Sequence, residues 1–510
     1  MTLKNIAVVG TGMSALGSIL ALVEAGLKPT VIDAGSLSDI GIPPTFDHLK
    51  DLPPRRWSEN DRASLIGTLS ATTRGLPRKL SFGSDAAYGA ASELYRGNRI
   101  PAYSHFLGGL SHVWGGSALI TPLGELRDWP IEPDEMTPYF QKCLSVLPYA
   151  ANSSGLDSHF GKPSVNSGLN ISHKDKIYLN RLEKNLQGNA FVGQSRLLVH
   201  SSGENNCKYC GFCMTGCAYS SIFKSSEMIA QLFSDGKIFL LENHVLNRIS
   251  ERGGNVILEL KDRVNRQVIS EEFEKVYLGA GAAETSRIIL NSVKSIQSVT
   301  LHGRGSCIVP LLSFTSTPIQ WPLVNTLPAI FIEFLDRKIG SWTHVQMTNQ
   351  NELIYKAFGF LKKGPIPKWR RYIAANVSTL MINDNSQYGV IYTLSRLKDE
   401  QNKVMVNFSS KGSKIRFLAK AFSHSFKIAW ALRIFPLVVF TKMNSQTYHL
   451  GGSFPMTAIP NKSNETDKFG RLSEFQNLYI VDSSSYPSIP STTLGILLTA
   501  NAWRITESSL

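Results

Sequence analysis

The sequence predicts an α/β protein in which a Rossmann-like βαβ domain is combined with an α+β domain built on a mostly antiparallel sheet. Two observations predict this class. Residues 4–35 contain a complete strand–turn–helix–strand unit, and residues 300–445 contain runs of alternating apolar residues, for instance AIFIEFL and YGVIYTL. The chain has 510 residues, more than one hydrophobic core usually serves, so we expect two closely packed domains.

The N-terminal unit begins with an apolar run at residues 6–9, which is typical of a buried parallel strand. A helix is predicted over residues 13–25 and the next strand over residues 30–32. Asp33 ends the second strand, where a carboxylate can accept hydrogen bonds from a ribose. The unit therefore predicts a dinucleotide site, and by itself it fits NAD and FAD equally.

The turn between the first strand and the helix has the pattern G-x-G-x-x-A, formed by Gly10, Gly12 and Ala15. The first glycine permits the tight turn, and the second lets a pyrophosphate approach the backbone. The alanine keeps the helix close to the strand. The free N–H groups that open the helix would then face the phosphates.

Three later parts of the chain show a family resemblance. They are LGGLSHVWGGSALITPL (107–123), VYLGAGAAETSRIILNS (276–292), and YHLGGSFPM (448–456) with the closing block 470–505. In this order, and with the N-terminal unit, the chain resembles the glucose–methanol–choline (GMC) family of FAD oxidoreductases. The resemblance covers about half of the chain and leaves out residues 300–445, as expected for a variable substrate domain.

The resemblance implies FAD rather than NAD, and a flavin-binding domain that is discontinuous in sequence. We expect this domain to comprise residues 1–35, 100–145, 190–300 and 445–510, with a substrate-binding domain at 300–445 that roofs the flavin. Residues 36–99 would be an excursion that covers the FAD as a lid.

The resemblance also implies which residues contact the flavin. Some relatives tether FAD through a histidine of the glycine-rich loop, but Val113 occupies that position here and His112 comes one place early. We therefore expect non-covalent FAD. The implied cofactor-binding residues are Gly10, Gly12, Ala15, Asp33, Gly108, Gly109, His112, Trp114, Gly115, Gly116, Gly281, Asp482 and Thr493.

His449 is the implied catalytic base. The family places a histidine beside the flavin in an H-x-x-G-S/T-x-x-M setting, which Gly452, Ser453 and Met456 complete here. Oxidising an alcohol requires removal of the hydroxyl proton as hydride leaves the carbon for the flavin. An imidazole titrates near neutral pH and can accept that proton.

The second catalytic position of the family, usually His or Asn, falls on Thr493. A threonine hydroxyl can donate one hydrogen bond to the substrate oxygen, but it is not a general base. Three alternatives follow: Thr493 acts with an ordered water, His449 acts alone, or the chain has lost turnover.

Four cysteines, Cys207, Cys210, Cys213 and Cys217, form the run C-x2-C-x2-C-x3-C. The compact spacing resembles that of bacterial ferredoxins, although Ala218 replaces the usual proline and no second run follows, so we expect at most one cluster. Within the GMC family, membrane-linked glucose and fructose dehydrogenases hold a three-iron cluster with C-x5-C-x3-C. The first, third and fourth cysteines reproduce that spacing, and Cys210 is either spare or the fourth ligand of a four-iron cluster.

An iron–sulfur cluster, [3Fe–4S] or [4Fe–4S], is thus the first expectation for this run. Zinc favours paired C-x2-C motifs separated by a longer loop, which are absent from the sequence. Plain reduced thiols, as in some long-chain alcohol oxidases that resemble this run, are the other alternative. Cys143 and Cys307 stand alone, and we expect them to be small buried residues.

The formal net charge of +14 favours anionic partners. Basic residues gather at 361–372 and 411–433, and the second stretch also has apolar residues at helical spacing. It fits a half-buried helix with a solvated basic face, and it is also a pattern that can lie on a membrane surface. No nucleic-acid motif accompanies the charge, so we expect no nucleic-acid partner. No bilayer-spanning run or leader is evident, so we expect a cytoplasmic protein, at most peripheral to a membrane.

These observations predict an FAD-dependent dehydrogenase that oxidises the CH–OH group of a sugar, polyol or other alcohol. The cluster would relay electrons to an external acceptor, a cytochrome or a quinone. Three alternatives stay beside it: an alcohol oxidase that uses dioxygen and holds no cluster, a lyase or isomerase without net oxidation, and a catalytically silent FAD-binding subunit.

Overall fold

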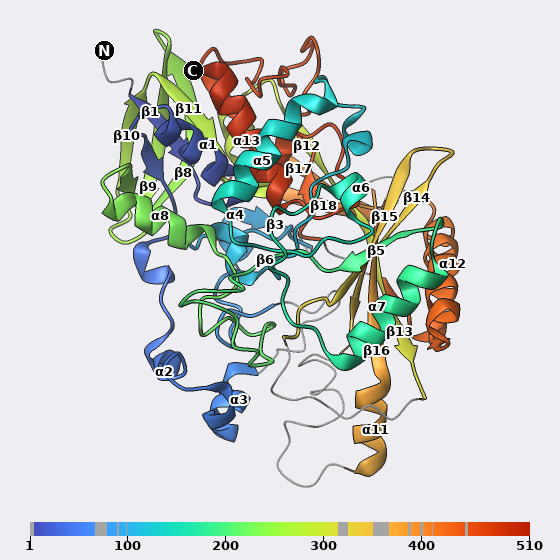
Figure 1. Ribbon diagram of the computed structural model, residues 1–510. Helices are drawn as coiled ribbons and strands as arrows, with labels where there is room; N and C mark the ends of the chain where they lie inside the picture. The colour runs from blue at the N-terminus through green and yellow to red at the C-terminus, as the bar shows by residue number, and fades with distance from the viewer. Residues whose placement is uncertain are drawn as a thin grey trace.

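The computed structural model describes residues 5–66, 79–88, 91–97, 99–314, 325–349, 367–385, 389–397, 400, 402–410, 412–443 and 447–510. Parts of the predicted lid (67–78, 89–90 and 98), of the predicted substrate domain (including 315–324 and 350–366) and of the basic stretch 361–372 therefore lie outside the described residues. Figure 1 shows one sheet beside the N-terminus and a second large sheet flanked by α7 and α12.

The first sheet is parallel, and its strands come from widely separated parts of the chain. Its order is β22 (Leu478–Ile480), β11 (Lys275–Leu278), β1 (Ile6–Val9), β2 (Thr30–Ile32) and β7 (Phe239–Leu241). All four strand pairings are parallel. The βαβ unit of the N-terminus thus forms as predicted, with its helix ending one residue early.

Two helices, α1 (Met13–Glu24) and α13 (Gly495–Ser509), pack closely beside this sheet. Gly17 explains the close approach, because a Cβ built there would lie 2.1 Å from the carbonyl oxygen of Thr499. The apolar residues of both helices, with those of β1, form one hydrophobic core. Because the closing helix completes this core, the C-terminus fixes the N-terminal unit in place.

The other side of the sheet carries α9 (Ala282–Ser292) and a three-stranded antiparallel sheet. That sheet consists of β8 (His244–Arg252), β9 (Asn255–Asp262) and β10 (Val268–Phe273). Their apolar side chains share a second core with those of the parallel sheet.

The second large sheet is antiparallel and lies mainly within residues 300–445. Its order is β19 (Phe435–Pro436), β13 (Gly305–Leu312), β16 (Val377–Asp384), β15 (Ser341–Thr348), β14 (Ile330–Asp336) and β5 (Phe191–Gln194), with β20 (Lys442–Met443) also paired to β13. The helices α7 (His173–Asn185) and α12 (Lys414–Leu432) contribute to the hydrophobic core on one of its faces.

The same region also contributes to a third sheet, so the alternating runs form two sheets rather than one. Its order is β21 (Leu450–Gly451), β12 (Ser298–Gly303), β17 (Val390–Arg396), β18 (Val404–Ser410) and β3 (Tyr95–Arg96). β21 directly follows His449 and pairs with β12, so the pairing of these two strands fixes the backbone beside the predicted base.

The described part of the excursion 36–99 contains α2 (Pro44–Asp47) and α3 (Glu59–Ile66). It packs on the cysteine loop: Trp57 stacks on Tyr219 at 5.8 Å between ring centroids, and the Tyr219 hydroxyl donates to the Leu52 carbonyl at 2.6 Å. The remaining elements are α4 (Ala91–Leu94), α5 (Thr137–Val146), α6 (Asp157–Phe160), α8 (Ser225–Ser234), α11 (Lys368–Asn376), β4 (Tyr149–Ala150) and β6 (Leu197–Leu198). Among the described residues no helix has the length and apolar character needed to cross a bilayer.

Candidate active site

The turn after β1 forms an open backbone cradle. Gly10 has a φ of +99°, and a Cβ there would lie 2.5 Å from the carbonyl oxygen of Gly279, so only glycine fits. A Cβ built on Gly12 or on Gly281 would meet no atom within 4 Å. These two glycines begin α1 and α9, so the open space lies at two helix N-termini. Such a cradle suits the phosphates of a dinucleotide.

Asp33 lies at the end of β2 beside this cradle. It accepts hydrogen bonds from the Thr11 hydroxyl (2.6 Å) and from the Gly35 N–H (2.7 Å), one on each carboxylate oxygen. Burial raises its pKa to about 6. Each oxygen keeps a further lone pair, so a ribose contact of Asp33 is chemically available and stays a prediction.

Asp482 connects the second side of the cradle to the C-terminal block. It accepts hydrogen bonds from the Gly281 N–H (2.8 Å), the Thr285 hydroxyl (2.6 Å) and the Ser484 N–H (2.9 Å). The carboxylate therefore fixes the N-terminus of α9 against the segment that precedes α13.

The glycine-rich loop is anchored to the same cradle by its own side chains. The Gly108 N–H donates to Thr11 Oγ1 at 2.6 Å, and the Gly108 φ of +90° makes the turn possible. His112 Nε2 donates to the Leu107 carbonyl at 2.6 Å, and burial lowers its pKa to about 4. Trp114 donates to the Phe223 carbonyl at 2.6 Å. His112 and Trp114 thus hold the shape of the loop, and their contact with the flavin stays a prediction.

Thr493, just before α13, is tied to the strand-like segment after this loop. Its Oγ1 accepts a hydrogen bond from the Leu119 N–H at 2.6 Å, and the residue is 3% exposed. The hydroxyl also lies 3.5 Å from the Leu119 carbonyl. The described contacts of Thr493 are therefore those of a group that holds the loop, and its predicted hydrogen bond to the substrate is untested.

His449 directly precedes β21 of the third sheet and contacts Arg304, which lies between β12 and β13. Its Nε2 is 3.4 Å from Nη2 of Arg304, and because a guanidinium only donates, Nε2 carries the lone pair. Its Nδ1 is buried and has no partner among the described residues. Burial, together with the charges of Arg304 and His344, holds the pKa of His449 well below its usual range. The imidazole is therefore neutral, which is the form a general base requires.

Arg304 contacts this imidazole and Glu125 acts electrostatically on Arg304, and sequence reasoning missed both. Arg304 is 5% exposed and donates to the carbonyls of Ser491 (2.8 Å) and Thr492. Burial lowers its pKa to about 9. Glu125 accepts from the Ser491 hydroxyl at 2.8 Å, and burial raises its pKa to about 7. The only signal in the sequence is an arginine between the apolar runs of β12 and β13.

A row of polar side chains crosses the second sheet at matching positions. Glu333 lies opposite His344, His344 opposite Asn383, and Asn383 opposite Ser306, and each is at most 4% exposed. Their neighbours along the strands belong to the core under α7 and α12. Because successive side chains of a strand point to opposite faces, the row lies on the face away from that core.

One member of the row, His344, contributes to lowering the pKa of His449. Glu333 Oε1 lies 2.5 Å from His344 Nδ1, and Gln346 donates to His344 Nε2 at 2.9 Å. Burial raises the pKa of Glu333, while the positive charges of His344 and Arg304 act in the opposite direction. Its Oε2 is buried and has no partner among the described residues. The row therefore contains a carboxylate oxygen with no described partner, which can accept a hydrogen bond from a hydroxyl or amine donor.

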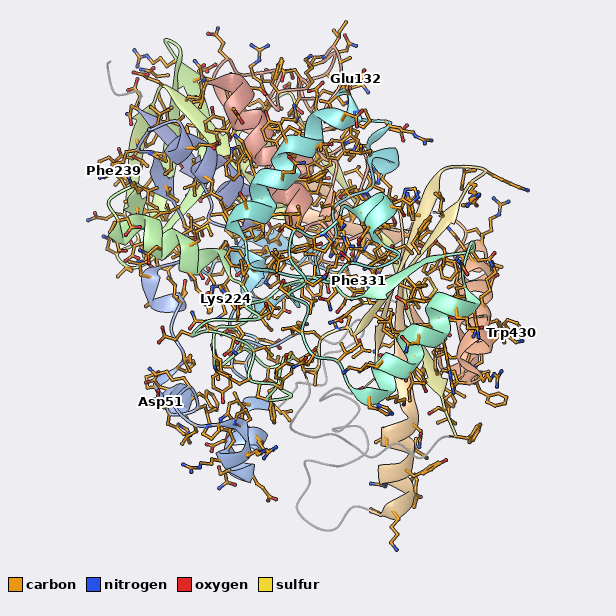
Figure 2. All side chains as sticks on the ribbon, viewed as in Figure 1. Asp51, Glu132, Lys224, Phe239, Phe331 and Trp430 are labelled. Carbon is orange, nitrogen blue, oxygen red and sulfur yellow. The ribbon has the colours of Figure 1, made fainter. Side chains whose placement is uncertain are left out.

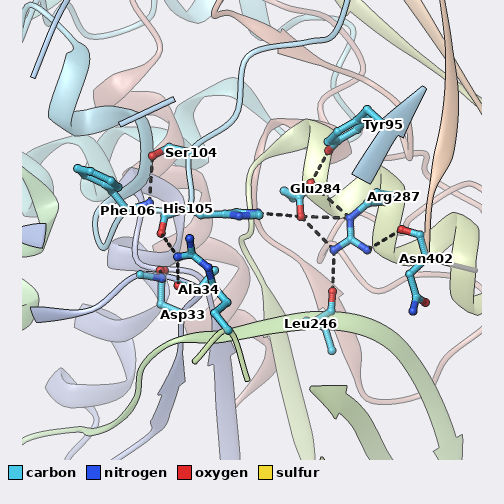
Figure 3. A network of polar contacts seen from close by, with 12 residues as sticks. Asp33, Ala34, Tyr95, Ser104, His105, Phe106, Leu246, Glu284, Arg287 and Asn402 are labelled. Atoms are coloured by element: carbon cyan, nitrogen blue, oxygen red, sulfur yellow. Dashed lines mark hydrogen bonds and ion pairs between the residues drawn. The ribbon is translucent and has the colours of Figure 1, made fainter. Parts of the chain in front are cut away.

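A separate buried network supports the end of β2 from outside the cradle (Figure 3). Glu284 of α9 accepts from Tyr95 and pairs with Arg287 at 3.0 Å, and His105 Nε2 lies 3.5 Å from it. Burial alone would raise the pKa of Glu284, but Arg287 and His105 hold it well below the usual range. Arg287 also donates to the Leu246 carbonyl at 2.7 Å, so the network joins α9, β3 and β8.

The four cysteines of the run line one small cavity together with Val199 and Leu327. None of the six cysteines, all of which lie in the described residues, forms a disulfide, and Cys143 and Cys307 are fully buried, as predicted. Burial raises the pKa of Cys207 and Cys210, and the neighbouring thiols raise it further. The four thiols therefore share one buried environment.

Each sulfur of the run also accepts a backbone hydrogen bond. The donors are the N–H groups of Tyr209 (to Cys207), Phe212 (to Cys210), Thr326 (to Cys213, 3.4 Å) and Ser221 (to Cys217, 3.2 Å). Left-handed backbone at Tyr209, Gly211 and Gly216 turns the loop around the sulfurs. Within the described parts of the chain, no three or more His, Cys, Asp or Glu side chains are grouped closely enough for a single metal ion.

The cysteine cavity is adjacent to the glycine-rich loop. Trp114 packs in the same hydrophobic cluster as Cys207, Cys213 and Cys217. Its ring also faces Gly495 of α13, where a Cβ would lie 2.6 Å from the indole. The indole of Trp114, in the glycine-rich loop, therefore packs both with the thiols and against α13.

Residues 385–502 match the family model described as GMC oxidoreductase. Over this part of the chain the sequence is similar to the GMC oxidoreductase family, which supports the resemblance seen in the sequence motifs. FAD is the cofactor that this family implies, and the open glycine cradle fits it. His449 and Thr493 both lie within the matched region.

Comparison with solved structures gives a match over the whole chain. Pyridoxine 4-oxidase from Mesorbium loti has a TM-score of 0.62 and 14% sequence identity, over 99% of this chain and 99% of that one. At this identity the likeness is one of fold. A comparison with curated proteins gives no match.

Proposed function

We propose that this protein is a GMC oxidoreductase that oxidises the CH–OH group of an alcohol, a polyol or a sugar, with His449 as the base. The observation that carries the proposal is the buried imidazole of His449, whose Nε2 lies 3.4 Å from Nη2 of Arg304 and whose pKa is held well below its usual range by burial. Bound FAD supplies the hydride acceptor, and the hydroxyl proton leaves to the imidazole, so the alcohol becomes a carbonyl compound.

The chain's own residues divide the remaining work. Arg304 can only donate, so Nε2 of His449 is the unprotonated nitrogen, and it accepts the proton when the substrate hydroxyl takes the place of the Arg304 contact. The positive charge of Arg304 stabilises the negative charge that develops on the substrate oxygen. Glu333 and His344 supply acceptors and donors that orient the hydroxyl groups of the substrate. Thr493 accepts a hydrogen bond from the Leu119 N–H and so holds that segment against the start of α13.

For electron disposal, we propose that the four cysteines hold one iron–sulfur cluster, [3Fe–4S] or [4Fe–4S]. The support is that four sulfurs border one cavity and that each accepts a backbone N–H, an arrangement that tunes such clusters. A cluster binds each thiolate through a different iron, so its sulfurs stand farther apart than the ligands of one ion. The protein would then be a dehydrogenase that passes electrons singly to a cytochrome or quinone.

The competing proposal is an oxidase without a cluster, in which dioxygen takes the electrons. It is favoured by the name of the similar structure, an oxidase. The two proposals differ in iron and acid-labile sulfide content and in peroxide release during turnover.

The test is an anaerobic visible and EPR spectrum of the freshly purified protein, recorded before and after addition of a panel of alcohols, polyols and sugars. We expect flavin bands that bleach with at least one substrate, and a cluster signal that changes with them. If no alcohol bleaches the flavin and no carbonyl product forms from any of them, alcohol oxidation is contradicted. That result would favour the lyase or the silent subunit. Bleaching without iron, followed by peroxide formation in air, would select the oxidase.

A further inference from the structure

Large apolar side chains stand exposed along one edge of the second domain. Trp430 is 79% exposed, Val439 84% and Phe440 69%. We call this set the aromatic edge. Its members are Phe314, Trp369, Tyr372, Phe426, Trp430, Phe435, Val439 and Phe440, each more than 40% exposed.

The fold brings these residues together from three segments. Phe435 of β19 pairs with Leu312 at the end of β13, and its ring contacts Phe314 at 5.4 Å between centroids. The Tyr372 hydroxyl of α11 donates to the Phe314 carbonyl at 3.0 Å. Trp430 lies in the last turn of α12, just before the chain turns into β19. Phe314, Tyr372 and Phe435 therefore form one contiguous group, and β19, which carries Phe435, also contacts α12.

The outward direction of α12 is fixed by its opposite face. Phe417, Ala421, Ile428 and Leu432 are buried in the core between this helix and the sheet. Figure 2 shows Trp430 projecting outward on the side of the molecule opposite Phe239. No core of the described domain requires these exposed rings, and monomeric proteins rarely leave so many in one place.

The surface around the aromatic edge is positively charged. Residues 401–464 contain no Asp or Glu. The exposed cations there include Lys414, Arg416, Lys427 and Arg433. Nearby on β16, Asp384 is buried and paired with Lys420 at 3.0 Å. An anionic partner therefore meets almost no repulsion on this edge.

We propose that the aromatic edge docks on an anionic lipid surface, with its rings in the headgroup region and its lysines and arginines against lipid phosphates. Trp and Tyr favour this interface because one end of the side chain is apolar and the other carries a polar group, and Phe is typical of the apolar face that enters it. Each Lys or Arg near an anionic leaflet contributes on the order of 1 kcal/mol. Nucleic acid could pair its phosphates with the lysines and arginines, but it would leave the apolar side chains of the aromatic edge exposed to water. This docking is independent of the proposed redox chemistry.

The test is flotation of the purified full chain with vesicles of phosphatidylcholine alone and vesicles that also contain phosphatidylglycerol, each at low and high salt. We expect binding to the anionic vesicles that weakens as salt rises. Replacing Trp430 and Phe440 together by alanine should weaken it by about tenfold or more, because two large apolar side chains no longer insert. Lys414→Glu with Lys427→Glu should also weaken it.

The matched control is Phe239→Ala, an exposed aromatic residue on the opposite side, which should bind as the wild type does. All substituted side chains are exposed, and flavin content and circular dichroism confirm that each variant folds. The proposal is overturned if anionic vesicles are not bound, if both vesicle types bind equally, or if the Trp430 and Phe440 variant binds like the control. Binding to duplex DNA or an acidic polypeptide without vesicle binding would overturn it too.

Discussion

The glycine cradle gives a prediction in which two neighbouring glycines behave oppositely. At Gly10, alanine meets both an unfavourable φ of +99° and a Cβ only 2.5 Å from the Gly279 oxygen. The backbone strain costs about 1–3 kcal/mol and the overlap about as much again. Gly10→Ala should therefore lower the free energy of unfolding by about 2–6 kcal/mol.

At Gly12 the backbone is extended, with a φ of −67°, and a Cβ meets no protein atom within 4 Å. Gly12→Ala should leave the stability of the protein without FAD within about 0.5 kcal/mol of the wild type. The added methyl group occupies space that the proposed pyrophosphate needs. Crowding of about 1–3 kcal/mol corresponds to FAD binding that is about 5- to 150-fold weaker.

The assays are denaturant unfolding of flavin-free protein and FAD titration followed by flavin fluorescence. Gly41→Ala is the control, because Gly41 is exposed, has equally open surroundings and lies outside the turn. The reasoning is refuted if Gly12→Ala unfolds early while it binds FAD normally, or if Gly10→Ala is as stable as the wild type.

Three further predictions concern the site. Burial raises the pKa of Glu125 to about 7 in the folded chain, above its usual value in the unfolded chain, so the folded state holds this proton more tightly. The free energy of unfolding of the wild type should therefore fall by up to about 3 kcal/mol, relative to that of Glu125→Gln, as the pH rises from about 4.5 to about 7. Thr493→Val leaves the Leu119 N–H without its acceptor and should lower stability by about 1–3 kcal/mol, whereas Thr493→Ser should not; equal unfolding midpoints would contradict the tie. Cys213→Ser should remove most bound iron while FAD stays, and Cys143→Ala should retain iron; elemental analysis that shows equal iron in both would exclude the cluster.

The sequence predicted those parts of the molecule that depend on local pattern. The strand–turn–helix–strand unit of residues 4–35 has its glycines, helix and terminal acid within one short segment, and it folds as expected. His449 was singled out by its immediate neighbours in the sequence, and its role as the base stays a prediction. The antiparallel character of the second domain followed from the alternation of apolar residues in β14 and β17, although the division into two sheets did not.

The environment of His449 depends on pairings between distant strands, which no local pattern encodes. Arg304 reaches the imidazole across 145 positions of sequence, and Thr493 finds its backbone partner across 374 positions. The row from Glu333 to Ser306 exists only because β14, β15, β16 and β13 pair in one particular register. The acceptor of the Thr326 N–H likewise could not be read from the cysteine spacing alone.

The most direct measurement is the rate of anaerobic flavin reduction in a single turnover, with a bleaching alcohol from the panel, for the wild type, His449→Ala and the exposed control His173→Ala. If the imidazole of residue 449 takes the hydroxyl proton, His449→Ala retains its flavin but reduces it about 100- to 10,000-fold more slowly, while the control matches the wild type. Reduction of the retained flavin in His449→Ala at the wild-type rate would contradict the assignment of the base.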